Sequence, residues 1–240
     1  RIAWWGNDNI PSGYGVAGVA TRNSCRHLVG GTMNNCGGPR ILVVGKHGFI
    51  ATSLARHLLG VGMVVDVVGR PEVDFLDDHS VGRLVGSGST WDALIFTPTR
   101  GGRRTSADGM SVIEDNLHMH RNMLRLLPLV GVSFIFGSGA EFGRHRSIER
   151  VRSSELGDVM PRDPYGLSKA LIALDARRHA KVVNLRLFNC FGPGEADNRM
   201  MSAAVSCALR GEPVTVHQDR EFDFFWVEDL GRVVVHYLSA

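Results

Sequence analysis

The chain has 240 residues and a net charge of +3, from 27 basic and 24 acidic side chains that are interspersed. This balance argues against a nucleic-acid partner, which needs a concentrated basic stripe. No uninterrupted apolar run reaches the ~18 residues of a membrane helix, so we expect no membrane segment. The length suits one large domain, or one domain with an appendage.

The spacing of the cysteines indicates the redox state of the cellular compartment. Cys25, Cys36, Cys190 and Cys207 show neither CxxC nor metal-ligand spacing. We therefore expect free thiols, no metal site and a cytoplasmic location.

Residues 1–39 do not share the pattern of the rest of the chain. Arg1 to Trp5 fits a short strand, and Gly30 to Gly38 reads as a flexible connector. We treat residues 1–39 as an N-terminal extension to which the sequence assigns no role. The chain begins at Arg1 without an initiator Met or a signal peptide, which we expect of a trimmed or fragmentary chain.

Residues 41–59 carry the strongest local pattern. The apolar run Ile41 to Val44 is typical of a parallel strand that is buried on both faces. A glycine loop and an amphipathic helical pattern follow directly. Strand, glycine turn and helix together predict a dinucleotide-binding opening, in which Gly45 permits the turn, Gly48 lets the backbone approach a pyrophosphate, and Ala51 allows close packing.

The N-terminus of this first helix supplies free N–H groups and partial positive charge to an anion. The glycine pattern alone is weak, because many such turns bind nothing. The cofactor-binding residues that we predict here are Gly45, Lys46, Gly48, Phe49 and Ile50.

Apolar runs and helical stretches alternate from this point onward. The predicted strands are 41–44, 63–68, 73–75, 93–96, 132–136 and 182–188. The predicted helices are 50–59, 78–85, 108–127, 165–179, 197–210 and 228–238. This alternation predicts an α/β fold with a doubly wound parallel sheet of the Rossmann type.

The end of the second predicted strand discriminates between cofactors. An acidic residue there would hold the ribose 2′-hydroxyl of NAD, but the chain has Gly69 followed by Arg70. A guanidinium suits a 2′-phosphate, so we favour NADP, with NAD as the alternative. Lys46 could add charge to the same phosphate, and both cations could instead be solvated. Asp74 could accept from the adenine amine or be an exposed loop carboxylate.

Tyr165 and Lys169 lie four residues apart and share a face of a predicted helix. An ammonium and a nicotinamide should lower the pKa of the phenol below its usual ~10. Tyr165 could then serve as general base for an alcohol and general acid for a ketone. Ser138 follows the strand predicted at 132–136, where strand ends line the ligand crevice, and could hydrogen-bond the reacting oxygen.

From about Ile41 to the C-terminus the chain resembles the extended short-chain dehydrogenase/reductase family of NAD(P)-dependent nucleotide-sugar epimerases, dehydratases and reductases. The motifs that carry this resemblance occur in the family's order. They are the glycine loop, Asn116, Ser138, Tyr165 with Lys169, residues 185–194 (Leu-Arg-Leu-Phe-Asn-Cys-Phe-Gly-Pro-Gly) and residues 224–230 (Phe-Phe-Trp-Val-Glu-Asp-Leu).

The resemblance implies roles for these positions. Ser138, Tyr165 and Lys169 would be the catalytic set, and Tyr165 and Lys169 would also contact the cofactor. Asn116 would be a structural asparagine. Thr97 lies at the end of the fourth predicted strand, where relatives usually have a pair of alanines, and we include it among the cofactor-binding residues. The resemblance places Ser138 and Asn189 in the substrate site. The arginine that relatives often carry before the last motif is Phe222 here, so Arg220, two residues earlier, is the candidate for that substrate contact.

Departures from the family's sequence pattern reduce the number of reactions that we expect this chain to catalyse. Sugar dehydratases carry an Asp-Glu pair where this chain has Gly139 and Ala140, and Glu141 lies one residue too far along. Ala140 also stands near the position of a cysteine in the GDP-fucose-forming epimerase-reductases. Hydride transfer at sugar C4 by an epimerase or a 4-keto reductase remains. The alternative from another class is a non-catalytic NADP-binding regulatory or interaction module.

The domain organisation follows from the same resemblance. Residues 40–189 would form the NAD(P)-binding Rossmann domain. Residues 190–240 would supply a small substrate lobe and return to the sheet. Family members usually continue for several dozen residues, so we expect a truncated lobe. We also expect a nucleotide-sugar substrate. The helices around Asn116 and Lys169 often pair subunits in this family, so a homodimer is one candidate for an oligomeric state that the sequence leaves open.

Overall fold

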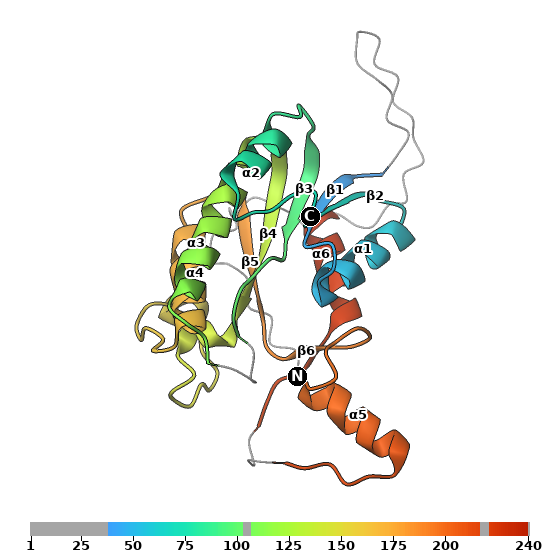
Figure 1. Cartoon of the computed structure of the whole chain (residues 1–240), viewed down its shortest axis with the longest axis vertical. Coiled ribbons are helices and arrows are strands. Elements are labelled where there is room, and N and C mark those ends of the chain that lie inside the picture. The colour runs from blue at the N-terminus through green and yellow to red at the C-terminus, as the bar shows by residue number, and fades with distance from the viewer. Residues whose placement is uncertain (1–37, 103–106, 217–220, 240) are drawn as a thin grey trace.

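The computed structural model describes residues 38–102, 107–216 and 221–239. Five parallel strands form its central sheet, in the order β2-β1-β3-β4-β5 (Figure 1). The strands are β1 (Arg40–Val44), β2 (Val64–Val68), β3 (Trp91–Phe96), β4 (Val130–Ser138) and β5 (Val182–Leu187). The strand order reverses between β1 and β3, which makes the carboxyl ends of these two strands the place where such sheets open a ligand crevice.

Helices cover both faces of the sheet (Figure 1). The helices on one face are α1 (Phe49–Gly60) and α6 (Val227–Ser239), and those on the other are α2 (Asp78–Val85), α3 (Ser111–Leu124) and α4 (Pro164–Ala176). Alternate residues of β1 serve the two layers: Ile41 and Val43 pack with α1 and α6, whereas Leu42 packs with α2 and α3. The predicted doubly wound Rossmann sheet is confirmed.

The strand predicted at 73–75 is wrong. Residues 69–77 fold as turns, in which the Val73 N–H donates to the Gly69 carbonyl and the Leu76 N–H donates to the Asp74 carboxylate. Phe75 is buried against Phe96, with ring centroids 4.9 Å apart. The apolar residues of this segment therefore anchor a turn in the core.

The last part of the chain forms a small second unit of structure. A two-stranded parallel sheet joins β6 (Cys190–Phe191) to β7 (Phe225–Trp226). Between them α5 (Met200–Arg210) stands apart from the central sheet and has no fully buried residue (Figure 1). In the described part of the chain, no helix has the length and apolarity to cross a bilayer.

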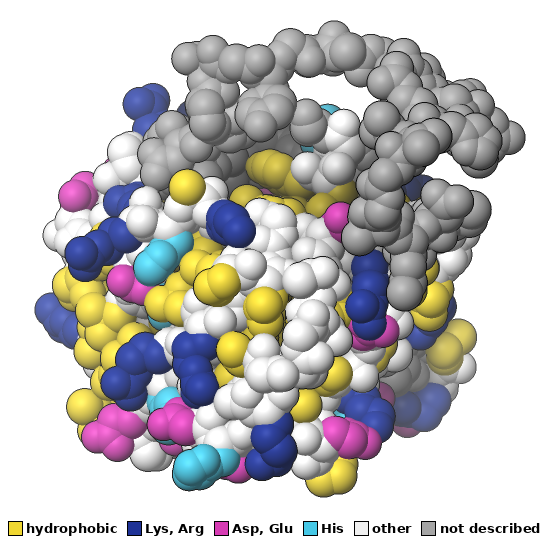
Figure 2. All heavy atoms as spheres, turned by 90° about the horizontal axis from the view of Figure 1, so that it is seen from above, with side chains coloured by type: hydrophobic (Ala, Val, Ile, Leu, Met, Phe, Trp, Pro, Cys, Tyr) yellow, Lys and Arg dark blue, Asp and Glu magenta, His cyan; other side chains and the backbone are white. Residues whose placement is uncertain are grey.

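The two signs of charge alternate on the face seen in Figure 2, with Lys and Arg beside Asp and Glu and with apolar side chains between them. The described cysteines, Cys190 and Cys207, are free thiols. The strand predicted at residues 1–5 lies outside the described residues, as do Cys25 and Cys36.

The packing of α1 on α6 depends on one glycine. A Cβ built on Gly231 would lie 2.3 Å from Cγ and Cδ2 of His57, so the two helices meet where Gly231 has no side chain. Gly231→Ala should lower the free energy of unfolding by about 1–3 kcal/mol, because the methyl overpacks this contact. In an unconstrained helix the same change is worth about 1 kcal/mol of stabilisation.

Urea unfolding of the single and double variants tests this contact. Gly231→Ala combined with His57→Ala should recover stability relative to Gly231→Ala alone. A double variant no more stable than Gly231→Ala would contradict the contact.

Candidate active site

The glycine loop joins the end of β1 to α1 and needs glycine at its first position. Gly45 has φ +115°, and a Cβ there would lie 2.1 Å from the Thr97 hydroxyl oxygen. That hydroxyl donates to the Val44 carbonyl at 2.8 Å. Thr97, predicted to bind cofactor, thus locks the ends of β1 and β3 together beside the loop.

The first turn of α1 is built to receive an anion. Its N-cap is Gly48, which has no side chain to bond the first-turn amides of Phe49 and Ile50, and the first turn contains no acidic residue. Uncapped N–H groups at the positive end of a helix attract phosphate. A pyrophosphate therefore fits here.

The cations predicted to bind a 2′-phosphate lie at the end of β2. Gly69 is buried against Lys46, and a Cβ on it would lie 2.9 Å from the Lys46 backbone nitrogen. Lys46 Nζ pairs with Glu72 Oε1 at 2.7 Å on the surface, and the Lys46 hydrogen bond lowers the pKa of Glu72. Sequence reasoning missed Glu72, whose carboxylate lies beside Lys46. Arg70 is exposed.

Tyr165 and Lys169 lie on the first two turns of α4. Asp163 caps this helix by accepting from the Gly166 N–H at 2.9 Å, and Pro164 occupies its first position. Lys169 is buried, and its Nζ donates to the Phe136 carbonyl of β4 at 2.9 Å and lies 5.9 Å from the centre of the Tyr165 ring. The structure brings the phenol and the amine together, as predicted from their spacing.

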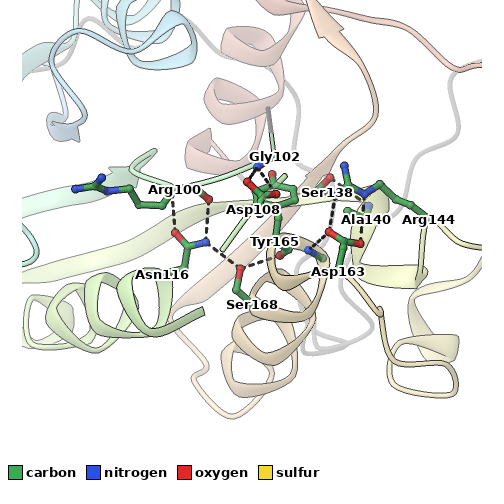
Figure 3. A network of polar contacts seen from close by, with 11 residues as sticks. Arg100, Gly102, Asp108, Asn116, Ser138, Ala140, Arg144, Asp163, Tyr165 and Ser168 are labelled. Atoms are coloured by element: carbon green, nitrogen blue, oxygen red, sulfur yellow. Dashed lines mark hydrogen bonds and ion pairs between the residues drawn. The ribbon is translucent and has the colours of Figure 1, made fainter. Parts of the chain in front are cut away.

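Ser138 ends β4 beside Tyr165 (Figure 3). Its Oγ accepts from the Ala140 N–H at 3.2 Å, and its side chain hydrogen-bonds the Tyr165 phenol. Ser138, Tyr165 and Lys169 therefore form one cluster at the carboxyl end of β4.

The expected lowering of the Tyr165 pKa is wrong for the chain by itself. Burial of the phenol raises its pKa, and the negative charge of Glu141 raises it further, whereas the Ser138 hydrogen bond opposes the shift. Burial also lowers the pKa of Lys169 to about 8, with Glu141 opposing. Desolvation outweighs the attraction between neighbouring charges, so the Tyr165 phenol and the Lys169 amine are both less inclined to carry a charge than in water.

Asn116 ties three segments together behind the cluster (Figure 3). Its amide nitrogen donates to the Ser168 hydroxyl at 2.9 Å and to the Arg100 carbonyl at 3.1 Å, and its oxygen accepts from the Arg100 N–H at 2.7 Å. Ser168 Oγ in turn donates to the Tyr165 carbonyl at 2.7 Å. Buried Asn116 thereby fixes the loop after β3 against α4.

That loop also contacts the phenol directly. A Cβ on Gly102, at φ +74°, would lie 2.9 Å from Cζ of Tyr165, so the backbone of Gly102 lies on the ring. Its N–H donates to both carboxylate oxygens of Asp108 at 3.0 and 3.1 Å (Figure 3). We did not predict this contact; the Gly101-Gly102 pair was its only signal.

One pocket adjoins the cluster, and a second lies at the N-terminal end of α5. The first lies against Lys169 and is lined by Phe96, Pro98, Thr99, Asn116, His120 and Lys169 among others. The second is lined by Asn189, Phe191, Glu195, Arg199, Met200 and Phe224 among others.

Asn189, predicted to bind substrate, lines this second pocket at φ +40°, and its amide donates to the Asp223 carbonyl at 3.1 Å. Asp74, predicted near the adenine, uses its carboxylate to accept from Leu76 N–H. Arg220 lies outside the described residues.

Comparison with known proteins identifies the family. Residues 41–240 match the family described as "NAD dependent epimerase/dehydratase family". An ADP-L-glycero-D-manno-heptose-6-epimerase of Pseudomonas paraeruginosa is 29% identical over 236 residues, which cover 83% of this chain and 69% of that protein.

Two solved structures share the fold. The GDP-D-glycero-L-gluco-heptose synthase of Campylobacter jejuni, solved in the presence of NADPH, aligns with a TM-score of 0.70 and 14% identity over 84% of this chain and 74% of that one. The UDP-glucose 4-epimerase of Thermus thermophilus, solved with NAD, aligns with a TM-score of 0.66 and 22% identity over 84% and 75%. With its Rossmann sheet, glycine loop and Ser-Tyr-Lys cluster, the chain belongs to the NAD dependent epimerase/dehydratase family.

Proposed function

We propose that this chain is an NAD(P)-dependent oxidoreductase or epimerase that acts on a nucleotide-linked sugar, with Tyr165 as general acid/base. The observation that carries the proposal is the cluster of Ser138, Tyr165 and Lys169 at the carboxyl end of β4. The uncapped N-terminus of α1 begins at the carboxyl end of β1, at the same edge of the sheet. Family membership supports the same reading.

The chemistry divides between the cofactor and the side chains. The bound nicotinamide supplies a hydride acceptor and donor. The Tyr165 phenolate removes a proton from the sugar hydroxyl during oxidation, and the phenol returns it during reduction. Ser138 donates a hydrogen bond to the reacting oxygen, and the Lys169 ammonium stabilises the phenolate and holds the nicotinamide ribose.

The reacting carbon has two candidates. The residues around Ser138 favour a 4-epimerase or 4-keto reductase, because Gly139 and Ala140 supply no acid for dehydration. Glu141 is engaged by Arg186 and the Ser138 N–H and is no substitute. Four curated relatives favour instead the C6 carbon of a nucleotide-linked heptose, since each of the four is named a heptose-6-epimerase.

NADP is the favoured cofactor, with NAD as the alternative. Exposed Arg70 and Lys46 support NADP, because cations at the end of β2 and in the glycine loop suit a 2′-phosphate, and structural neighbours carry either form. A homodimer through α3 and α4 and a cytoplasmic location belong to the same proposal. A purely regulatory NADP-binding module is the competing reading, and it would not need both Tyr165 and Lys169.

Replacing the phenol should separate binding from chemistry. Tyr165→Phe should lower kcat by about 10²–10⁴-fold, because the acid/base is lost, while NADPH affinity, followed by fluorescence, should change far less than turnover. Turnover would be measured with an ADP-heptose epimer and with a 4-keto nucleotide sugar, which distinguishes C6 from C4. Tyr237→Phe, a phenol packed on Phe134 away from the cluster, is the control. Equal turnover by wild type and Tyr165→Phe would refute the assignment.

The rate should fall as the pH rises through the Lys169 pKa of about 8. The ammonium is present below that pH and lost above it, so kcat/KM should show an alkaline limb. Lys169→Arg should move the limb upward, because a guanidinium stays charged to above pH ~12. An unmoved limb in Lys169→Arg would assign the titration to another group.

The 2′-phosphate preference can be tested at Arg70. Arg70→Ala should weaken NADPH binding about tenfold, or ~1.4 kcal/mol, and leave NADH binding unchanged. Arg83→Ala, an exposed arginine on α2, is the matched control. Equal loss for both cofactors in fluorescence titrations would argue against recognition of the phosphate by Arg70.

A further inference from the structure

A buried ion pair lies directly behind Ser138. Arg186 of β5 donates from Nε to Glu141 Oε2 at 2.6 Å, and the two side chains are 5% and 0% exposed. Glu141 Oε1 accepts from the Ser138 N–H at 2.9 Å. One carboxylate thus joins β5 to the residue that ends β4.

The surroundings of this carboxylate match its ionised form. Each oxygen receives one N–H donor, from Ser138 or from Arg186, and a proton on either oxygen would compete with that donor. Burial raises the pKa of Glu141, and the charge and hydrogen bond of Arg186 oppose that rise. Arg186 is itself held by donation from Nη1 to Ser153 Oγ at 3.0 Å.

The Glu141 carboxylate occupies space that is open because residue 137 is a glycine. A Cβ on Gly137 would lie 2.2 Å from Glu141 Oε1 and 2.7 Å from Asn184 Oδ1. Any side chain at Gly137 would therefore displace Glu141 from Ser138. The buried amide of Asn184, which has no hydrogen-bond partner among the described residues, lies next to the same space.

The charge of Glu141 reaches the candidate catalytic groups. It acts on both Lys169 and Tyr165, opposing loss of the proton from each. The other groups around Lys169 are the Phe136 carbonyl, the Tyr165 ring and, across the adjoining pocket, Asn116 and His120. Arg144 and Arg199 act on Tyr165 in the opposite sense to Glu141.

We propose that Glu141, paired with Arg186, is a positioning residue of this site that fixes the Ser138 main chain and supplies a negative charge to the Tyr165–Lys169 pair. It contacts neither substrate nor cofactor. Its importance for turnover rests on the proposed function, but its charge acts on Lys169 whether or not the chain turns over a sugar.

The test exploits the small number of lysines. Lys46, Lys169 and Lys181 are the three lysines of the chain, so ¹³C-lysine labelling gives three Cε signals, and Lys169→Met identifies the one from Lys169. In the wild type that signal should titrate with a midpoint of about 8. In Glu141→Gln the midpoint should fall by at least about 0.5 unit, because a neighbouring negative charge is lost.

Two further variants serve as controls for the Lys169 titration. Glu149→Gln, which neutralises an exposed carboxylate nearby in the chain, should leave the midpoint unchanged. If Glu141→Gln fails to fold because Arg186 is left buried without a partner, Glu141→Gln with Arg186→Leu removes both charges. That double variant should fold and keep the lowered midpoint.

The outcomes are distinct. A Lys169 midpoint that is unchanged in Glu141→Gln or in the folded double variant overturns the proposal. A lowered midpoint supports it even if no nucleotide sugar is turned over by the wild type, a result that would count against the proposed function alone. If turnover is found, the alkaline limb of kcat/KM should move to lower pH by the same interval in Glu141→Gln.

Discussion

The parallel hydrogen bonding of β1, β3 and β4 is the constraint on which the rest of this structure depends. In-register pairing of Val44 with Phe96 and of Phe96 with Ile135 brings the carboxyl ends of the three strands to one edge of the sheet. The glycine loop leaves that edge from β1, Thr97 from β3 and Ser138 from β4. Residues almost a hundred positions apart in the sequence thus meet at one edge of the sheet, because the parallel register of the strands places them there.

Burial decides the electrostatics of the cluster. Water excluded from Tyr165 and Lys169 makes each of them harder to ionise, so the chain alone holds a neutral phenol. In the proposed mechanism the positive charge of a bound nicotinamide would tip this balance toward phenolate. The polar network through Asn116, Ser168 and Arg100 ties the backbone of α4 at Tyr165 to the loop after β3.

Local pattern was enough to predict much of this. The strands of the sheet, the glycine loop and the meeting of Tyr165 with Lys169 follow from apolar periodicity and from spacing on one helix, which depend only on near neighbours. The turn at 73–75 was missed because a buried Phe75 in a turn and one in a strand have the same apolar signature.

What the sequence could not reveal depends on distant segments. Glu72 beside Lys46, Gly102 on the Tyr165 ring and Glu141 with Arg186 each join residues from separate elements. The raised pKa of Tyr165 also depends on distant segments, since the desolvation of the phenol is set by everything packed around it. The motif residues were found because their chemistry repeats at fixed spacing, and these contacts have no such spacing.

The most direct measurement is a structure of this chain with NADP bound. The account predicts that the pyrophosphate lies on the first turn of α1, that Lys169 contacts the nicotinamide ribose, and that the nicotinamide ring faces the Tyr165 hydroxyl and Ser138. A dinucleotide bound with its nicotinamide away from Tyr165, or with Lys169 still engaged only by the Phe136 carbonyl, would contradict it.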